Sequence, residues 1–144
     1  MLTAQIKAYF PYLLLAAVAI ILFVLPQPVQ QYLEYNRAAI ADGQLWRLLS
    51  GHLLHSNSYH LLMNMAGLMV MMLIHGALAQ RLALCWQYLI FSAAISVALW
   101  FFSPQIQLYV GLSGVLHGLL CFGAVLDIRQ GYRSGYLILV GVAA

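Results

Sequence analysis

Apolar residues are concentrated in five runs along the chain, and polar residues separate the runs. They cover residues 9–25, 60–79, 84–102, 113–126 and 136–144. An α-helix needs about 20 mainly apolar residues to cross a bilayer, with a range of about 17 to 25. The first three runs meet this requirement, the fourth is shorter, and the fifth ends with the printed sequence. The pattern predicts an all-α, polytopic membrane protein with about five transmembrane segments, the fifth incomplete.

The composition agrees with this class. Of the 144 residues, 65% are hydrophobic and 6% are charged, and the mean hydropathy is +0.92, whereas a soluble domain holds about a quarter charged residues. Because Pro26 and Pro28 follow the first run in place of a small-residue cleavage site, we expect that run to stay as a helix and not to be a cleaved signal peptide. We expect residues 1–144 to form a single membrane domain with no soluble module.

The basic residues predict the orientation, because cytoplasmic loops of membrane proteins carry an excess of Lys and Arg. With the N-terminus inside, four basic residues are cytoplasmic and two are outside, where Glu34 and Asp42 balance them. The four are Lys7, Arg81, Arg129 and Arg133, and the two are Arg37 and Arg47. The net charge of +3 therefore reflects topology and is no argument for nucleic-acid binding.

The polar stretch between the first two helices, residues 26–59, is expected outside. Its mixture of aromatic, aliphatic and polar residues suits the headgroup region. Within it, the pair Trp46-Arg47 is typical of an interfacial anchor. We expect this stretch to lie against the membrane and not to project into water.

A serine between glycines, in the segment Gly111-Leu112-Ser113-Gly114, stands where the fourth apolar run begins. Counted at ~1.5 Å per residue from the inner end of that run, Ser113 lies roughly 10 Å below the outer surface of a ~30 Å hydrocarbon core. Irregular backbone at this depth must be buried in protein or reached by water. A helix N-terminus there offers free backbone N–H groups and a positive dipole end, and Gly111 and Gly114 let another chain approach. The alternative is that Gly114 and Gly118 form a packing face and Ser113 caps the helix.

His60 and Asn64 lie four residues apart in the second run and share one helix face. Gly67 follows on the same stripe and would admit a neighbouring helix. Counted from the inner end of this run, Asn64 lies at ~25 Å and His60 at ~31 Å, against ~21 Å for Ser113. Polar side chains in an apolar helix are costly without partners, so both are functional candidates, here as donors to an oxyanion. A structural polar clasp between helices is the alternative.

A metal site is another interpretation of His52, His55 and His60. No carboxylate or cysteine accompanies them, and neither spacing is typical of zinc without a third ligand, so we expect no metal. We expect His75, near the inner end of the second run, to be interfacial. The two cysteines lie in different runs and suit small buried hydrophobic positions.

Taken together, these motifs resemble the rhomboid family of intramembrane serine proteases. The resemblance rests on Trp46-Arg47, on His55, His60 and Asn64, and on the serine segment, in this order over about residues 44–127. The joint occurrence is far more specific than any single motif. The longer string GLSGVLHGLL, residues 111–120, is similar in particular to the rhombosortase subgroup. That resemblance implies a bacterial inner-membrane enzyme that processes surface proteins bearing a C-terminal GlyGly-CTERM sorting helix.

The resemblance also implies a role for each motif residue. Ser113 would be the nucleophile that attacks a peptide carbonyl within the membrane. His60 and Asn64, with the backbone N–H of Ser113, would bind the oxyanion. His55 would help to order the external loop and its water, and Trp46-Arg47 would fold that loop against the helices.

The chain departs from the rhomboid pattern in one respect. Rhomboids pair the serine with a histidine on a sixth helix, whereas this sequence has no histidine after His117 and stops at Ala144 in the expected fifth helix. A serine without a base is a weak nucleophile. Three explanations are open: a truncated chain that lacks the sixth helix, a pseudoprotease that only binds transmembrane segments, or use of His117 or His60 as the base.

We therefore expect an intramembrane serine endopeptidase that cleaves membrane-anchored proteins and whose active site opens to the periplasmic side. Serine acyl chemistry needs no cofactor, so the expected partners are the protein substrate and the lipid bilayer. The alternative is a catalytically inactive rhomboid-like protein that holds a client transmembrane helix against the face formed by Gly114 and Gly118.

Overall fold

The computed structural model describes residues 2–75 and 84–144 of the protein. The described part is all-α except for two short strands. Its elements are α1 (Leu2–Val24), α2 (Gln27–Leu33), β1 (Tyr35–Asn36), α3 (Arg37–Ala41), α4 (Arg47–Ser50), the 3-10 turn η1 (Gly51–Leu53), α5 (Ser58–His75), α6 (Leu84–Phe102), β2 (Leu108–Tyr109), α7 (Ser113–Arg129) and α8 (Ser134–Ala143). Each of the five apolar runs thus lies largely in one helix.

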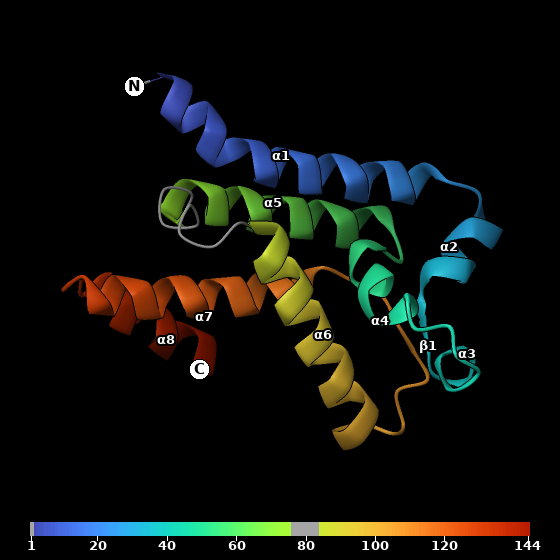
Figure 1. The fold of residues 1–144 in the computed structure, drawn as a ribbon. Coiled ribbons are helices and arrows are strands. Elements are labelled where there is room, and N and C mark those ends of the chain that lie inside the picture. The colour runs from blue at the N-terminus through green and yellow to red at the C-terminus, as the bar shows by residue number, and fades with distance from the viewer. Residues whose placement is uncertain (1, 76–83) are drawn as a thin grey trace.

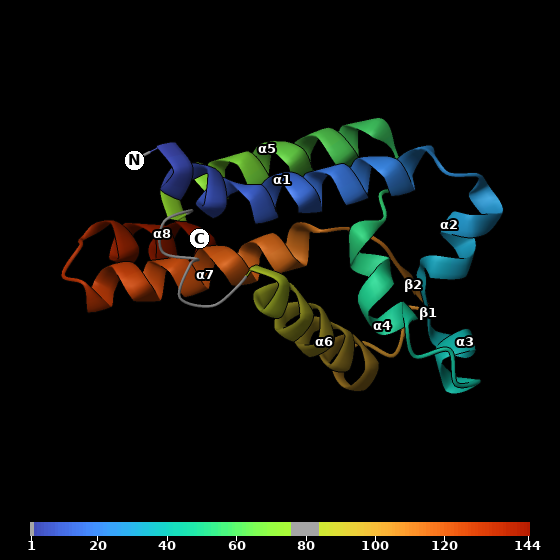
Figure 2. The same cartoon turned by 45° about the horizontal axis from the view of Figure 1, so that its top comes forward.

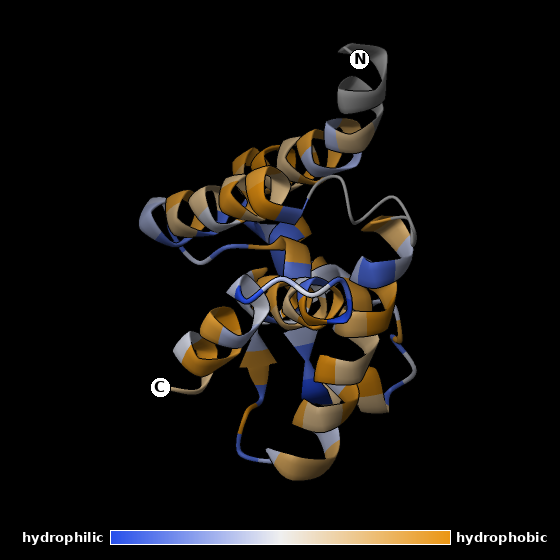
Figure 3. Cartoon of the chain, turned by 90° about the vertical axis from the view of Figure 1, so that its left-hand side faces the viewer, coloured by the Kyte–Doolittle hydropathy of each residue, from blue (hydrophilic) through white to orange (hydrophobic). Residues whose placement is uncertain are grey.

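Two of the described helices, α5 and α6, are long and apolar enough to cross a membrane by length and composition. The stretches Ala8–Val24 and Ser134–Ala143 are shorter apolar helices. The helices are mostly hydrophobic, and hydrophilic residues gather in the connections (Figure 3). The side chains of Lys7 and Arg81, on which part of the predicted orientation depends, lie outside the described residues.

Helices α1, α5 and α7 lie side by side, and α6 crosses them obliquely (Figures 1 and 2). Helices α5 and α7 run in the same direction, since His60 lies against Gly111, Gly67 against Leu116 and His75 against Gly123. The buried core lies where these helices meet; it includes Tyr12, Leu68, Met71, Leu112, Val115 and Leu119. Both α5 and α7 therefore begin at the same end of the bundle.

The short elements α2 to η1 gather at that end (Figure 1). Strands β1 and β2 pair antiparallel, with Tyr35 opposite Tyr109, so the chain that leads into α7 is held against the loop that follows α1. Arg37 donates hydrogen bonds to the carbonyl groups of Leu99 and Trp100 at the end of α6, and its guanidinium lies 4.4 Å from the Trp100 ring centre. These contacts tie the loop to both α6 and α7.

Candidate active site

The serine segment forms the entry into α7. The helix begins at Ser113, and Leu112 takes the N-cap position with no side-chain hydrogen bond to the first turn. The alternative in which Ser113 only caps the helix is therefore wrong, because Ser113 is the first helical residue and Leu112 takes the N-cap position. Its half-buried hydroxyl lies at a helix N-terminus whose first N–H groups carry the positive end of the dipole.

Gly111 holds the chain in a conformation that favours glycine. Its φ is +133°, and a Cβ at this position would lie 2.7 Å from Cε1 and 2.8 Å from Nε2 of His60. Its N–H donates to the Gly51 carbonyl at 3.2 Å, and its carbonyl accepts from the Tyr109 hydroxyl at 3.3 Å. The backbone before Ser113 is thus fixed by η1 and β2.

His60 lies on the first turn of α5. Asn57 precedes the helix, and its side-chain oxygen accepts the His60 N–H at 2.8 Å, which satisfies one of the free donors at the helix start. The Nδ1 atom of His60 lies 3.1 Å from the Ser56 hydroxyl oxygen. When Ser56 donates this hydrogen bond, the proton of the neutral ring is on Nε2, the atom that faces Gly111.

The structure brings His60 and Ser113 to one small space. The position that a Gly111 Cβ would occupy is 2.8 Å from Nε2 of His60 and 3.8 Å from Oγ of Ser113. Only a glycine leaves this space open. The two predicted site residues therefore meet across Gly111, although they are more than fifty positions apart in the sequence.

Asn64 lies one turn further along α5 and is buried, with 4% of its surface exposed. Its side-chain NH₂ group has no hydrogen-bond partner among the described residues. A buried amide donor without a partner costs roughly 1–3 kcal/mol. Asn64 thus carries an unused donor on the helix that packs against α7.

His55 is also buried, and its ring meets the His60 ring edge to face at 5.1 Å between centres. Within the described part of the chain, neither of its ring nitrogens has a hydrogen bond of normal geometry. Burial lowers the pKa of His55 to about 4, the nearby His60 acts in the same direction, and the Leu53 backbone opposes them. His55 is therefore a neutral ring that supports His60 from behind.

A buried polar group on the other side of the site was missed by the motif analysis. The Ser96 hydroxyl donates to the Leu48 carbonyl at 2.6 Å, so it accepts from Nε2–H of His52 at 2.9 Å. Burial lowers the pKa of His52 to about 4, opposed by the Ser92 backbone. This network anchors η1 to α6, and the polar stripe of Ser92 and Ser96 in an otherwise apolar run is the sequence signal that could have indicated it.

The Trp46-Arg47 pair holds the external loop together. Arg47 is 6% exposed and donates to the carbonyl groups of Gln31 at 2.7 Å and Glu34 at 2.8 Å. Trp46 donates its indole N–H to the Tyr32 carbonyl at 3.2 Å. The interpretation of Arg47 as a membrane-surface anchor is therefore wrong, because its guanidinium is occupied by loop carbonyls.

The face formed by Gly114 and Gly118 is covered by α6. A Cβ on Gly114 would lie 3.0 Å from Ile95, and one on Gly118 would lie 2.9 Å from the Phe91 ring. The predicted packing face is real, but its partner is this chain's own α6. The alternative in which a client helix docks on this face is therefore not supported by the packing, because α6 already occupies it.

His117 also lies close to Ser113, but its orientation does not suit a base. Its Nδ1 lies 2.8 Å from the Ser113 carbonyl oxygen, which accepts hydrogen bonds and does not donate them. Nδ1 must therefore carry a proton, so His117 presents a donor and not a lone pair to Ser113.

Among the described residues, no group of three or more His, Cys, Asp or Glu side chains is placed to hold a metal ion.

The expectation for His75 is wrong. It is 3% exposed and lies 3.4 Å from the Asp127 carboxylate, so it is a buried, paired side chain and not an interfacial one. The sequence analysis missed this because the partner stands 52 positions away.

The arrangement as a whole places a hydroxyl, a helix N-terminus and two side-chain donors at one end of the bundle. Ser113 offers a hydroxyl oxygen, and the His60 ring and the Asn64 amide lie on the adjacent helix. Such a set is suited to attack on a carbonyl and to binding of the resulting oxyanion.

Comparison with known proteins identifies one family. The family model described as Rhomboid domain matches residues 42–142, which is more than two thirds of the chain and includes Trp46-Arg47, His60, Asn64 and Ser113. A search of curated proteins gave no match.

Proposed function

Because this chain belongs to the rhomboid family of membrane-embedded intramembrane serine proteases, we propose that it hydrolyses peptide bonds of membrane proteins with Ser113 as the nucleophile. The observation that carries this proposal is the meeting of Ser113 and His60 across Gly111 at the start of α7. In the reaction, Ser113 Oγ bonds to the substrate carbonyl carbon and gives up its proton to a base. The amine leaves with a proton, and water then releases the acid and restores the serine.

The oxyanion of this reaction needs hydrogen-bond donors that are already in place. We assign this role to Nε2–H of His60, the NH₂ group of Asn64 and the backbone N–H of Ser113. The unused amide donor of Asn64 supports the assignment, because a buried donor gains a partner only when charge develops on the substrate oxygen. His55 and the Trp46-Arg47 pair act as supports, since they fix His60 and the loop around it.

The substrate class follows from the resemblance of residues 111–120 to rhombosortases. The proposal is that the enzyme lies in a bacterial inner membrane with its N-terminus in the cytoplasm and cleaves surface proteins at a C-terminal GlyGly-CTERM segment. A site at the periplasmic end of α5 and α7 agrees with substrates that are exported before they are cleaved. Residues 1–144 are proposed to belong to one membrane domain.

The decisive test uses the full natural chain encoded by the gene, co-expressed with a reporter that carries a GlyGly-CTERM segment. The wild-type protein is expected to cleave the reporter, and Ser113→Ala is expected to abolish cleavage with the protein still in the membrane. Ser103→Ala, which removes a hydroxyl from the loop before β2, is the matched control and should cleave normally. Equal cleavage by wild type and Ser113→Ala would overturn the nucleophile assignment.

A non-catalytic binding protein is the second candidate, because among the described residues no histidine nitrogen makes a hydrogen bond to the Ser113 hydroxyl. Copurification of uncleaved reporter with both wild type and Ser113→Ala, without any cleavage by either, would support this candidate.

A further inference from the structure

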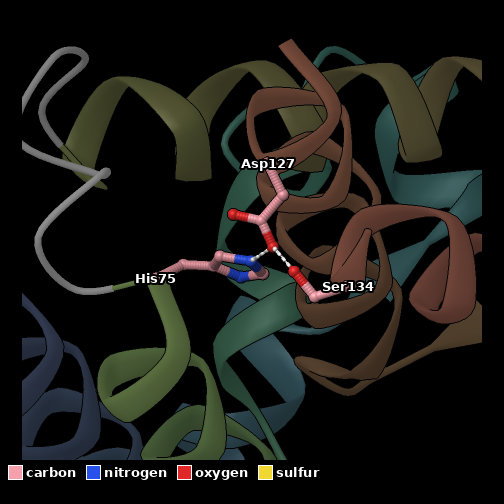
Figure 4. Close-up of polar contacts among 3 residues, drawn as sticks. All are labelled: His75, Asp127 and Ser134. Atoms are coloured by element: carbon pink, nitrogen blue, oxygen red, sulfur yellow. Dashed lines mark hydrogen bonds and ion pairs between the residues drawn. The ribbon is translucent and has the colours of Figure 1, made fainter. Parts of the chain in front are cut away.

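A buried polar cluster lies at the end of the bundle opposite to Ser113. One carboxylate oxygen of Asp127, on α7, makes two contacts (Figure 4). It accepts a hydrogen bond from the Ser134 hydroxyl at 3.0 Å, and it lies 3.4 Å from Nε2 of His75. His75 ends α5 and Ser134 begins α8, so one carboxylate joins three helices. Within the described residues this is the one close contact between a carboxylate and a basic side chain.

The packing around the cluster is specific to it. The imidazole of His75 lies flat against Gly123, where any Cβ would overlap the ring. Gly135, the residue after Ser134 in α8, lies directly against the backbone carbonyl group of Ala124 in α7. The glycines of α7 and α8 therefore bring the three backbones close enough for the short side chains to reach one another.

Stability alone does not account for these groups. Replacing a buried ion pair by apolar residues of similar volume is often neutral or stabilising, whereas a lone buried charge is costly. Between helices in lipid, apolar contacts do not favour one alignment of the helices over another, so hydrogen bonds and close packing set how the helices align. The contact of Gly67, near the middle of α5, with Leu116, in the first turn of α7, is apolar and does not by itself prevent sliding.

We infer that His75, Asp127 and Ser134 form a clamp that fixes the position of α5 along α7, and thereby holds His60 and Asn64 in place against Ser113. His75 and Asp127 are positioning residues in this account, because they act about 16 Å along α5 from Asn64 and about 21 Å along α7 from Ser113. A slip of α5 by one helical turn would move the donors by about 5.4 Å. The catalytic part of this inference rests on the proposed function.

The clamp itself is tested without any reaction. In the full natural chain with Cys85→Ala and Cys121→Ala, spin labels at Leu62 of α5 and Val125 of α7, both exposed, report the distance between the helices. Asp127→Leu is expected to shift the distance by about 2 Å or to broaden it. Asp127→Asn should leave the distance unchanged, because asparagine retains an acceptor oxygen. Gln130→Leu is the matched control; Gln130 is exposed and lies three residues after Asp127, so this variant should also leave the distance unchanged.

The effect on catalysis is tested by a double-mutant cycle. Asp127→Leu should lower kcat about 10-fold or more with KM within about 3-fold of wild type. In an Asn64→Ala background, Asp127→Leu should lower kcat by only about 2-fold, because the donor that the clamp positions is already absent. Distant sites with no coupling give additive losses.

Each outcome decides one part of the inference. An unchanged distance in Asp127→Leu would overturn the clamp, and additive losses in the cycle would overturn its role in positioning the donors. If the wild-type chain shows no cleavage that depends on Ser113, the proposed protease function and the positioning role fail together, and the spin-label distances still decide whether the clamp exists.

Discussion

Replacing Gly111 by alanine tests the meeting of His60 and Ser113 most directly. The new Cβ would lie 2.7 Å from Cε1 of His60, whereas ordinary contact begins at 3.4 Å, so the ring must retreat by about 0.7 Å. The backbone at Gly111 has a φ of +133°, which costs a non-glycine residue about 1–3 kcal/mol. The substitution therefore both displaces a proposed oxyanion donor and strains the turn into α7.

The expected result separates these two effects. A displacement of about 1 Å costs up to about 100-fold in rate, so kcat of Gly111→Ala should fall by roughly 10- to 100-fold with little change in KM. Gly131→Ala is the matched control, because Gly131 has a φ of +85° and no atom within 4 Å of the added Cβ. This control should lose about 1–2 kcal/mol of stability and keep its kcat.

The assay is cleavage of the reporter by purified protein in detergent, with thermal denaturation of the same samples. A kcat of Gly111→Ala within 2-fold of wild type would refute the role of His60 at this position. An equal loss of kcat in Gly131→Ala would show that strain, and not the displaced ring, is responsible.

Two further predictions concern stability. Because burial lowers the pKa of His52 and His55 to about 4, against about 6.5 in the unfolded chain, the unfolded state binds more protons between these pH values. Stability should therefore fall as the pH drops from 6.5 towards 4, by up to about 1.4 kcal/mol per pH unit for each histidine, and a melting temperature that is constant from pH 7 to pH 5 would contradict this. Arg47→Lys should lower stability by about 1–3 kcal/mol, because lysine cannot reproduce the planar set of bonds to the loop, while the exposed Arg129→Lys should melt as wild type does.

The helices and one end of the site were predictable from the sequence. Apolar runs predict helices because their backbone hydrogen bonds are local, and α6 ends where its run does, at residue 102. His60 and Asn64 were identified because polar residues in an apolar helix need a reason to be there. The glycines beside Ser113 were identified because a tight approach requires them.

Other features were not predictable because they depend on contacts between distant segments. The burial of His75 requires Gly123 and Asp127, which lie about fifty positions later in the sequence, on α7. Strand β2 pairs with β1, with Tyr109 opposite Tyr35 about seventy positions earlier, which no local pattern indicates. The occupation of Arg47 by carbonyl groups likewise depends on how the loop folds back.

The sequence by itself thus determined an all-α chain of apolar helices, the segments that carry the candidate chemistry and the family whose motifs they share. The tertiary structure decided that α5 and α7 run in parallel, that His60 meets Ser113 across Gly111, that α6 covers Gly114 and Gly118, and that Asp127 joins three helices at the far end. The physical reason is that hydropathy and helix formation are encoded by neighbouring residues. Each of these contacts depends instead on the relative position of two helices, and close packing and hydrogen bonds between residues far apart in the chain set that position.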